Sequence, residues 1–96
     1  MNYYFHEKAE FEFIKAVDYY EKCETGLGLR FSEEIYSSIK RVCCFPFAWE
    51  KIDFQTHRCL TDKFPYGVLY RVVDDHIRVM AIMHLHRMPD YWRKRK

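Results

Sequence analysis

Two runs of β-branched and aromatic residues, separated by a short polar turn, constrain the fold of this chain more than any other feature. The runs span residues 67–73 and 77–83, and residues 74–76 join them. This pattern predicts an antiparallel hairpin. Cationic and aromatic side chains crowd residues 84–93, directly after the second run. Because strand ends hold side chains on a rigid element, we look for function there first.

The N-terminal half has the periodicity of two helices. Residues 2–6 are aromatic and predict a short first strand. From Glu7 the apolar residues recur at helical spacing as far as Gly26, where a left-handed stop is favoured. A second helix is predicted from Leu27 to just before Pro46, because proline disfavours helix in the residue before it. The two apolar stripes are Ala9, Phe13, Val17 and Tyr20, with Ile14 and Ala16 beside them, and Leu27, Phe31, Ile35, Ile39 and Val42.

Together these elements predict an α+β fold in a single domain of residues 1–96. Residues 56–61 alternate enough to form a strand ahead of the hairpin, so the expected order is β-α-α-β-β-β with a short C-terminal turn or helix. Helices joined by so short a turn pack antiparallel, and each needs a sheet to cover its stripe. We therefore expect a helical hairpin on one face of a small, mostly antiparallel sheet, with residues 77–83 at its centre.

Composition limits the classes of function. Sixteen basic and 14 acidic residues give a net charge of +2, which is mild for a protein that grips RNA through its phosphates. Aromatic residues make up 19% of the chain, so some are expected at an interface. The four cysteines avoid C-x-x-C spacing and we expect no signal peptide, which favours free thiols in the cytoplasm. No apolar run is long enough for a membrane span.

Arg87 is the first candidate functional residue, because an always-charged guanidinium suits phosphate or carboxylate recognition. Its alternative role is a structural salt bridge to an acidic residue of a helix. His84 and His86 would share one face of an extended strand, and either suits acid–base chemistry near neutral pH. For His84 a structural role at the sheet edge is favoured. The sequence has no patterned third ligand, so we expect no metal site.

The C-terminal residues have two interpretations as well. Pro89 and the residues after it predict a short turn or helix that pins the tail to the rest of the protein. Trp92 fits an anchoring role better than a target contact. The basic residues at the C-terminus fit a solvated, frayed tail. No nucleotide, flavin or nucleophile motif is present, so we expect no cofactor and no small-molecule substrate.

These patterns, in their order and spacing, resemble the RelE/ParE superfamily of toxins from bacterial type II toxin–antitoxin pairs. The C-terminal part of the resemblance is F-P-Y-x-v-x-Y at 64–70, i-x-V-x-A-I-x-H at 77–84 and x-x-R-x-P-x-Y-W at 85–92. In the N-terminal half it rests on Ala9, Glu12, Ala16, Tyr19, Tyr20, Glu21, Gly26, Leu27, Gly28 and Phe31. The resemblance covers nearly the whole chain, implies the α+β fold already described, and is closer to the ParE-like branch.

The ParE-like branch implies a toxin that binds DNA gyrase, blocks replication and is neutralised by a cognate antitoxin. Growth inhibition and plasmid stabilisation are the biological roles that accompany this activity. The target-binding candidates are then Arg87, Tyr91, Trp92 and Arg93. On this interpretation the chain is not an enzyme.

The ribonuclease branch is the alternative, and it implies cleavage of mRNA bound to the ribosome. Its catalytic candidates here are Arg87, Tyr91 and His86. That branch has an arginine in the preceding strand where this chain has Gly67, so one clamp on the reacting phosphate would be missing. A third alternative is an attenuated member that retains antitoxin binding without strong toxicity.

Overall fold

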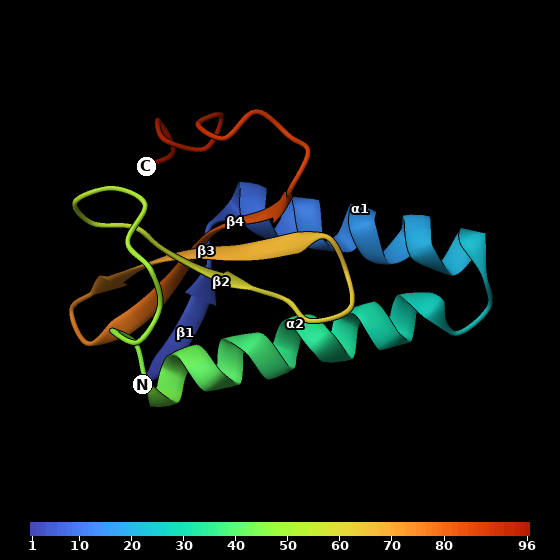
Figure 1. Cartoon of the computed structure of the whole chain (residues 1–96), viewed down its shortest axis with the longest axis horizontal. Helices are drawn as coiled ribbons and strands as arrows, with labels where there is room; N and C mark the ends of the chain where they lie inside the picture. The colour runs from blue at the N-terminus through green and yellow to red at the C-terminus, as the bar shows by residue number, and fades with distance from the viewer.

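The computed structural model describes residues 1–96 and consists of two helices packed on a four-stranded sheet (Figure 1). In chain order the elements are β1 (Asn2–Phe5), α1 (Glu7–Cys23), α2 (Leu27–Cys44), β2 (His57–Leu60), β3 (Tyr66–Val73) and β4 (His76–His84). The strands lie in the order β1-β4-β3-β2, with β1 parallel to β4 and the other pairs antiparallel. The predicted α+β order is confirmed, and β4 lies inside the sheet as expected.

The β3–β4 hairpin turns through Asp74 and Asp75, whose φ angles are 49° and 63°. Two successive left-handed residues are typical of a type I′ turn, whose twist matches that of the flanking strands. Aspartate tolerates this conformation because its short polar side chain bonds locally. His76 pairs with Val73 in the ladder, so the prediction that it belongs to the turn is wrong by one residue. Two residues suffice to reverse the chain here.

The sheet face below the helices carries the main apolar core. Its thirteen buried residues are Ala9, Phe13, Ala16, Phe31, Ile35, Ile39, Val42, Cys59, Val68, Tyr70, Ile77, Val79 and Ile82. Phe31 lies among Tyr20, Phe64 and Tyr66, with ring centroids 4.9–5.1 Å away. The predicted α2 stripe therefore does lie across the sheet. Ile14 is 60% exposed, because its position on α1 turns it away from α2 and the sheet.

The two helices approach each other closely at Gly28. A Cβ atom at this position would lie 2.6 Å from the Val17 carbonyl oxygen and 2.9 Å from Cβ of Glu21. The Glu21 carboxylate accepts hydrogen bonds from the main-chain nitrogens of Gly26 and Gly28, at 2.9 and 3.0 Å. Gly26 has the left-handed conformation predicted for it, with φ of 87°. One side chain of α1 thus caps the first turn of α2.

The opposite face of the sheet is covered by the segment that follows β4 (Figure 1). Residues 89–94 form turns, and Trp92 is fully buried against Leu69, Ala81 and Met83. The ladder shifts between Leu69 and Tyr70, which pair with Ala81 and Val79 and leave Met80 as an extra, bulged residue. We call this surface the tail face, and the surface below α1 and α2 the helix face. Neither helix is long and apolar enough to cross a membrane.

Candidate functional site

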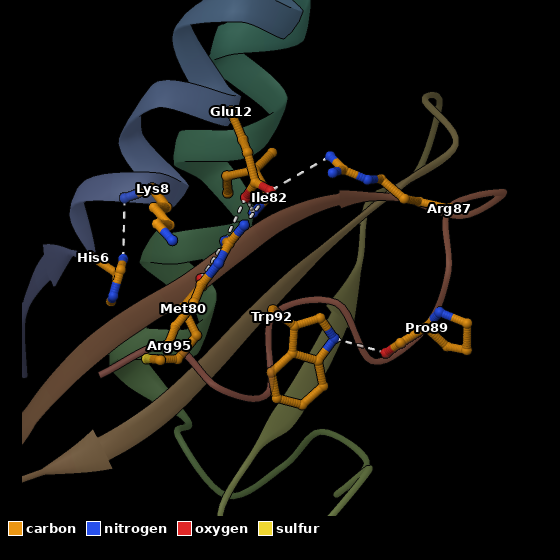
Figure 2. Close-up of polar contacts among 9 residues, drawn as sticks. All are labelled: His6, Lys8, Glu12, Met80, Ile82, Arg87, Pro89, Trp92 and Arg95. Carbon is orange, nitrogen blue, oxygen red and sulfur yellow. Dashed lines mark hydrogen bonds and ion pairs between the residues drawn. The ribbon is translucent and has the colours of Figure 1, made fainter.

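The Glu12 carboxylate of α1 joins three parts of the molecule (Figure 2). The Arg95 guanidinium donates to both of its oxygens, with Nη1–Oε1 at 2.8 Å and Nη2–Oε2 at 2.7 Å. The main-chain nitrogen of Ile82 in β4 donates to Oε1 at 3.1 Å. Arg95 also donates to the carbonyl oxygen of the bulged Met80 at 2.9 Å. The side chains of Glu12 and Arg95 are only 11% and 9% exposed, so this pair fixes the tail to the helix and the sheet.

The Tyr91 ring lies close to two guanidinium groups beside this pair. The Arg87 and Arg95 guanidinium carbons lie 4.0 and 5.0 Å from the centre of its ring. Burial raises the pKa of the Tyr91 phenol, and the nearby Glu12 carboxylate raises it further. Hydrogen bonding to Glu12 raises the pKa of Arg95 despite the opposing effect of burial. Tyr91 is thus a protonated phenol held in a cation–π stack.

Arg87 is the outermost member of this group. Its side chain is 56% exposed, and its Nη1 lies 3.7 Å from Oε2 of Glu12, which is a long ion pair. The structure is compatible with both roles considered for Arg87. Its long contact with Glu12 of α1 corresponds to the structural salt bridge, and its solvent-exposed guanidinium corresponds to the recognition of an anion. Because Arg95 already neutralises Glu12 at short distance, the charge of Arg87 remains available to an incoming anion.

The two histidines lie at the end of β4. The strand ends at His84, so His86 belongs to the following turn and the expected shared strand face does not form. Their rings nevertheless lie 5.3 Å apart, because the His86 main-chain nitrogen donates to Nδ1 of His84 at 3.1 Å. His84 also meets the Tyr66 ring edge-on at 5.1 Å. No group of three potential metal-binding side chains occurs in the structure.

Two of the target-binding candidates are tied into the protein. The buried indole of Trp92 donates its Nε1 hydrogen to the carbonyl oxygen of Pro89 at 2.7 Å. This is the anchoring role that the sequence favoured, and a fully buried ring has no surface to offer a target. Arg93 lies over Trp92 and bonds the Asp53 carboxylate at 2.9 Å. Of the four candidates, Arg87 is the most open, while Tyr91 is half-buried behind it.

An open groove of about 500 Å³ runs between α1 and the end of β4. Its lining residues are Lys8, Phe11, Glu12, Lys15, Ala16, Tyr19, Tyr66, Ile82, His84, Arg87 and Arg95. Arg87 was the only candidate among them that the sequence identified as a presented cation. The sequence analysis missed three cations of the groove, Lys8, Lys15 and Arg95. The two lysines lie on the polar side of a predicted helix, where solvated side chains are expected, and the basic C-terminal segment that contains Arg95 was expected to fray.

Gly67 lies in β3 on the tail face, opposite Leu60 and Met83. A Cβ atom there would lie 3.3 Å from Cγ of Arg58, whose side chain covers this glycine. Arg58 in turn pairs with the exposed Glu50 at 2.7 Å. Arg58 therefore covers Gly67 and is already paired with Glu50.

These features place the chain in the class of α+β proteins with a RelE/ParE-like fold. A solved structure of the "Chromosomal ParDE TA system from P. aeruginosa" contains a similar chain, with a TM-score of 0.75 and 16% sequence identity. The similarity covers 90% of this chain and 97% of that one. No family model and no curated protein matches the sequence. At this identity the likeness shows the fold, which is the fold that the sequence motifs implied.

Proposed function

We propose that this chain is the toxin of a type II toxin–antitoxin pair, of the ParE-like kind. The observation that carries the proposal is the extent of the structural likeness, since nearly the whole of both chains superposes and the other belongs to a ParDE toxin–antitoxin system. The motifs at residues 64–70 and 77–92 point to the same superfamily independently of the coordinates. The chain would act in the cytoplasm, where it inhibits growth until its antitoxin neutralises it.

Inhibition of DNA gyrase fits the geometry better than cleavage of RNA. Cleavage needs several charges aimed at one phosphate in the transition state. Gly67 supplies no cation, and the neighbouring Arg58 is paired with Glu50. Tyr91 has a raised pKa, whereas an efficient general base has a pKa near the working pH. A toxin that traps its target by binding needs only an exposed, chemically distinctive surface, which Arg87 and the groove provide.

The cognate antitoxin is the expected protein partner. Large apolar side chains stay exposed over the helical hairpin and the first strand: Tyr3, Tyr4, Phe11, Ile14, Tyr19, Leu29 and Tyr36 are 42–64% exposed. β1 is an edge strand, so its outer edge is free to pair. An antitoxin segment that is part helical and part extended would cover both surfaces. Coexpression with the protein encoded by the adjacent gene, followed by affinity purification, tests this partner.

Cleavage of ribosome-bound mRNA remains the second candidate function, because one observation favours it. The groove brings Arg87, His84 and Tyr66 together with two lysines, and this collection is able to hold a phosphate beside an acid–base group. On that interpretation Arg87, His86 and Tyr91 would be the residues to test. An attenuated member that only binds its antitoxin would lack both activities.

A paired assay separates these functions. Purified protein is added to a gyrase supercoiling reaction and, separately, to translating ribosomes whose transcript ends are mapped. We expect loss of supercoiling and no codon-positioned cleavage. In both assays Arg87→Ala is compared with Arg30→Ala, a matched exposed arginine that pairs with Glu24 on the helical hairpin. Cleavage with normal supercoiling would replace the gyrase proposal by the ribonuclease one. If the protein neither inhibits supercoiling nor causes cleavage, the attenuated member is the remaining alternative.

A further inference from the structure

The groove between α1 and the end of β4 is more strongly positive than the chain as a whole. Its lining contains four cationic side chains and a single carboxylate, that of Glu12, whereas the whole chain has 16 basic and 14 acidic residues. Arg95 donates to both oxygens of that carboxylate, at 2.8 and 2.7 Å. The cations that remain without a close carboxylate are Lys8, Lys15 and Arg87.

These three cations are open to an incoming ligand. Lys8 and Lys15 are exposed, and neither forms an ion pair. They lie two turns apart on α1, a rise of roughly 10 Å along the helix. Arg87 is 56% exposed and enters the groove from the turn that follows β4 (Figure 2). Positive charge therefore reaches the groove from both of its walls.

Aromatic rings lie among these cations. Phe11 and Tyr19 of α1 line the groove and are 61% and 62% exposed. The Lys15 amino group lies 5.3 Å from the centre of the Phe11 ring, which restrains this lysine. No cation covers the Tyr19 ring, which meets the Tyr20 ring edge-on with centroids 5.4 Å apart. Tyr19 therefore offers a free aromatic surface one helical turn beyond Lys15.

The sheet side of the groove contributes a phenol. Tyr66 of β3 lines the groove beside His84, whose ring it meets edge-on. Burial raises the pKa of the Tyr66 phenol, and the nearby Glu12 and Arg87 act on it in opposite directions. The phenol keeps its proton at neutral pH, so it is able to donate a hydrogen bond to an anion.

We propose that this groove binds a nucleotide that carries a chain of phosphates. The phosphates would lie along α1 between Lys8 and Lys15, with Arg87 on the opposite side and the base stacked on Tyr19. Lysine binds phosphate as a point charge, and arginine binds two phosphate oxygens through its planar fork. Three uncompensated cations suit a chain of phosphates better than a single one. The groove volume of about 500 Å³ is that of a small-molecule site.

Two observations favour a nucleotide over other polyanions. An acidic peptide would use the cations but would leave the exposed Tyr19 ring without a flat partner, which a base supplies. A long nucleic-acid strand needs a basic surface that extends beyond one groove, and a net charge of +2 is small for that. The sequence has no nucleotide motif because these cations come from distant segments that only the fold brings together.

Isothermal titration calorimetry of the full chain with ATP, adenosine and tripolyphosphate tests the site. We expect ATP to bind about tenfold more tightly than tripolyphosphate, which is the size of one base–aromatic stack, and adenosine not to bind measurably. In the ¹⁵N-labelled protein, ATP should shift the main-chain amide signals of α1 and of the end of β4. The amide signals of α2 should stay in place.

Two variants separate the phosphate contacts from the base contact. Lys15→Gln is expected to weaken ATP and tripolyphosphate alike, about tenfold, whereas Lys22→Gln should stay within about twofold. Lys22 is the matched control because it is exposed on the same helix and pairs with Asp18. Tyr19→Ala should weaken ATP about tenfold and leave tripolyphosphate unchanged. Its control is Tyr36→Ala, which removes a ring that is 47% exposed on α2.

Thermal unfolding of each variant checks that it is folded, as expected for exposed side chains. No binding of ATP at millimolar concentration, or unchanged ATP binding in Lys15→Gln, would overturn the proposal. Equal affinity for ATP and tripolyphosphate would overturn the nucleotide in favour of an unspecific polyanion. Tighter binding of a six-nucleotide single-stranded DNA would replace the nucleotide by a nucleic acid. The inference goes beyond the toxin proposal, and its failure would leave that proposal standing because toxicity is not the readout.

Discussion

The two faces of the sheet are covered by different kinds of contact. On the helix face, thirteen buried residues pack into one apolar cluster, and Phe31 lies at its aromatic centre. On the tail face, three buried residues, Leu69, Ala81 and Met83, surround the buried Trp92, and arginines around them stack on rings or pair with single carboxylates. Apolar packing is nondirectional and cooperative, whereas a few polar contacts can be exchanged. We infer that the helix face holds the fold and that the tail face is able to change.

The largest effect is expected on the helix face. Phe31→Ala should lower the free energy of unfolding by about 3–5 kcal/mol, because the ring is fully buried and its loss leaves a cavity. Chemical denaturation monitored by circular dichroism measures this change. Phe54→Ala is the matched control, since that ring is 83% exposed and its removal should cost less than about 0.5 kcal/mol. Similar costs for the two variants would contradict the assignment of the core.

The next effect is on the attachment of the tail. Glu12→Gln should cost about 1.5–3 kcal/mol, because the charged hydrogen bonds to Arg95 are weakened. The loss should be local, so trypsin should cleave near Lys94 sooner while hydrogen exchange in α2 stays slow. Glu10→Gln, an exposed change on the same helix, serves as control. If hydrogen exchange becomes faster to the same extent on both faces, the tail face is not held independently of the helix face.

A smaller effect should appear on acidification. Burial pushes the pKa of Asp53 up, but hydrogen bonds from Gln55 and Thr56 and the charge of Arg93 outweigh it, so its pKa lies below the usual value. A lowered carboxyl pKa adds stability above the unfolded-state value of about 3.9, and this stability is lost as pH falls through the folded-state pKa. The Trp92 indole NMR signal should shift below about pH 4.

Asp53→Asn should abolish that acid-dependent shift, because the amide does not titrate in this range. Asp62→Asn, which changes an exposed aspartate in the loop before β3, should leave the shift in place. A shift that survives in Asp53→Asn would assign the acid sensitivity of the tail face to another group.

The smallest change in stability is expected for Arg87→Ala. A side chain that is 56% exposed, with one ion pair at 3.7 Å, should contribute within about 0.5 kcal/mol. Toxicity in a growth assay should nevertheless be lost, because the variant removes the open cation of the groove between α1 and the end of β4. Thermal unfolding of the purified variant checks the first expectation. If the protein unfolds, Arg87 is structural and leaves the list of functional residues.

Much of the fold was predictable because it depends on local patterns. The stripe through Phe31 and Ile35 has helical spacing, the runs around Asp74 and Asp75 have strand composition, and each pattern specifies which side is buried. The parallel pairing of β1 with β4 was not specified by any local pattern. It brings residues 2 and 76 together, and such a contact depends on the whole chain.

The candidate site was predictable only in part, for the same reason. Arg87 stood out because it follows a strong strand. Glu12 was noted only as a residue of the resemblance, since its contacts lie 70 and 83 residues further along the chain. Arg95 was predicted to belong to a solvated tail. Nothing in the basic run of residues 93–96 indicates that Arg95 pairs with the carboxylate of Glu12.

The parallel pairing of β1 with β4 also has a consequence for synthesis. β4 is the strand that joins β1 to β3, yet it is the last strand to leave the ribosome. Until it does, β1 has no neighbour, and the apolar stripes of α1 and α2 have no complete sheet to cover. Contacts between distant parts of a chain form slowly, and apolar surface left open in the meantime invites association. A nascent chain of this kind would be inactive, would expose apolar surface and could be bound by another protein before it folds.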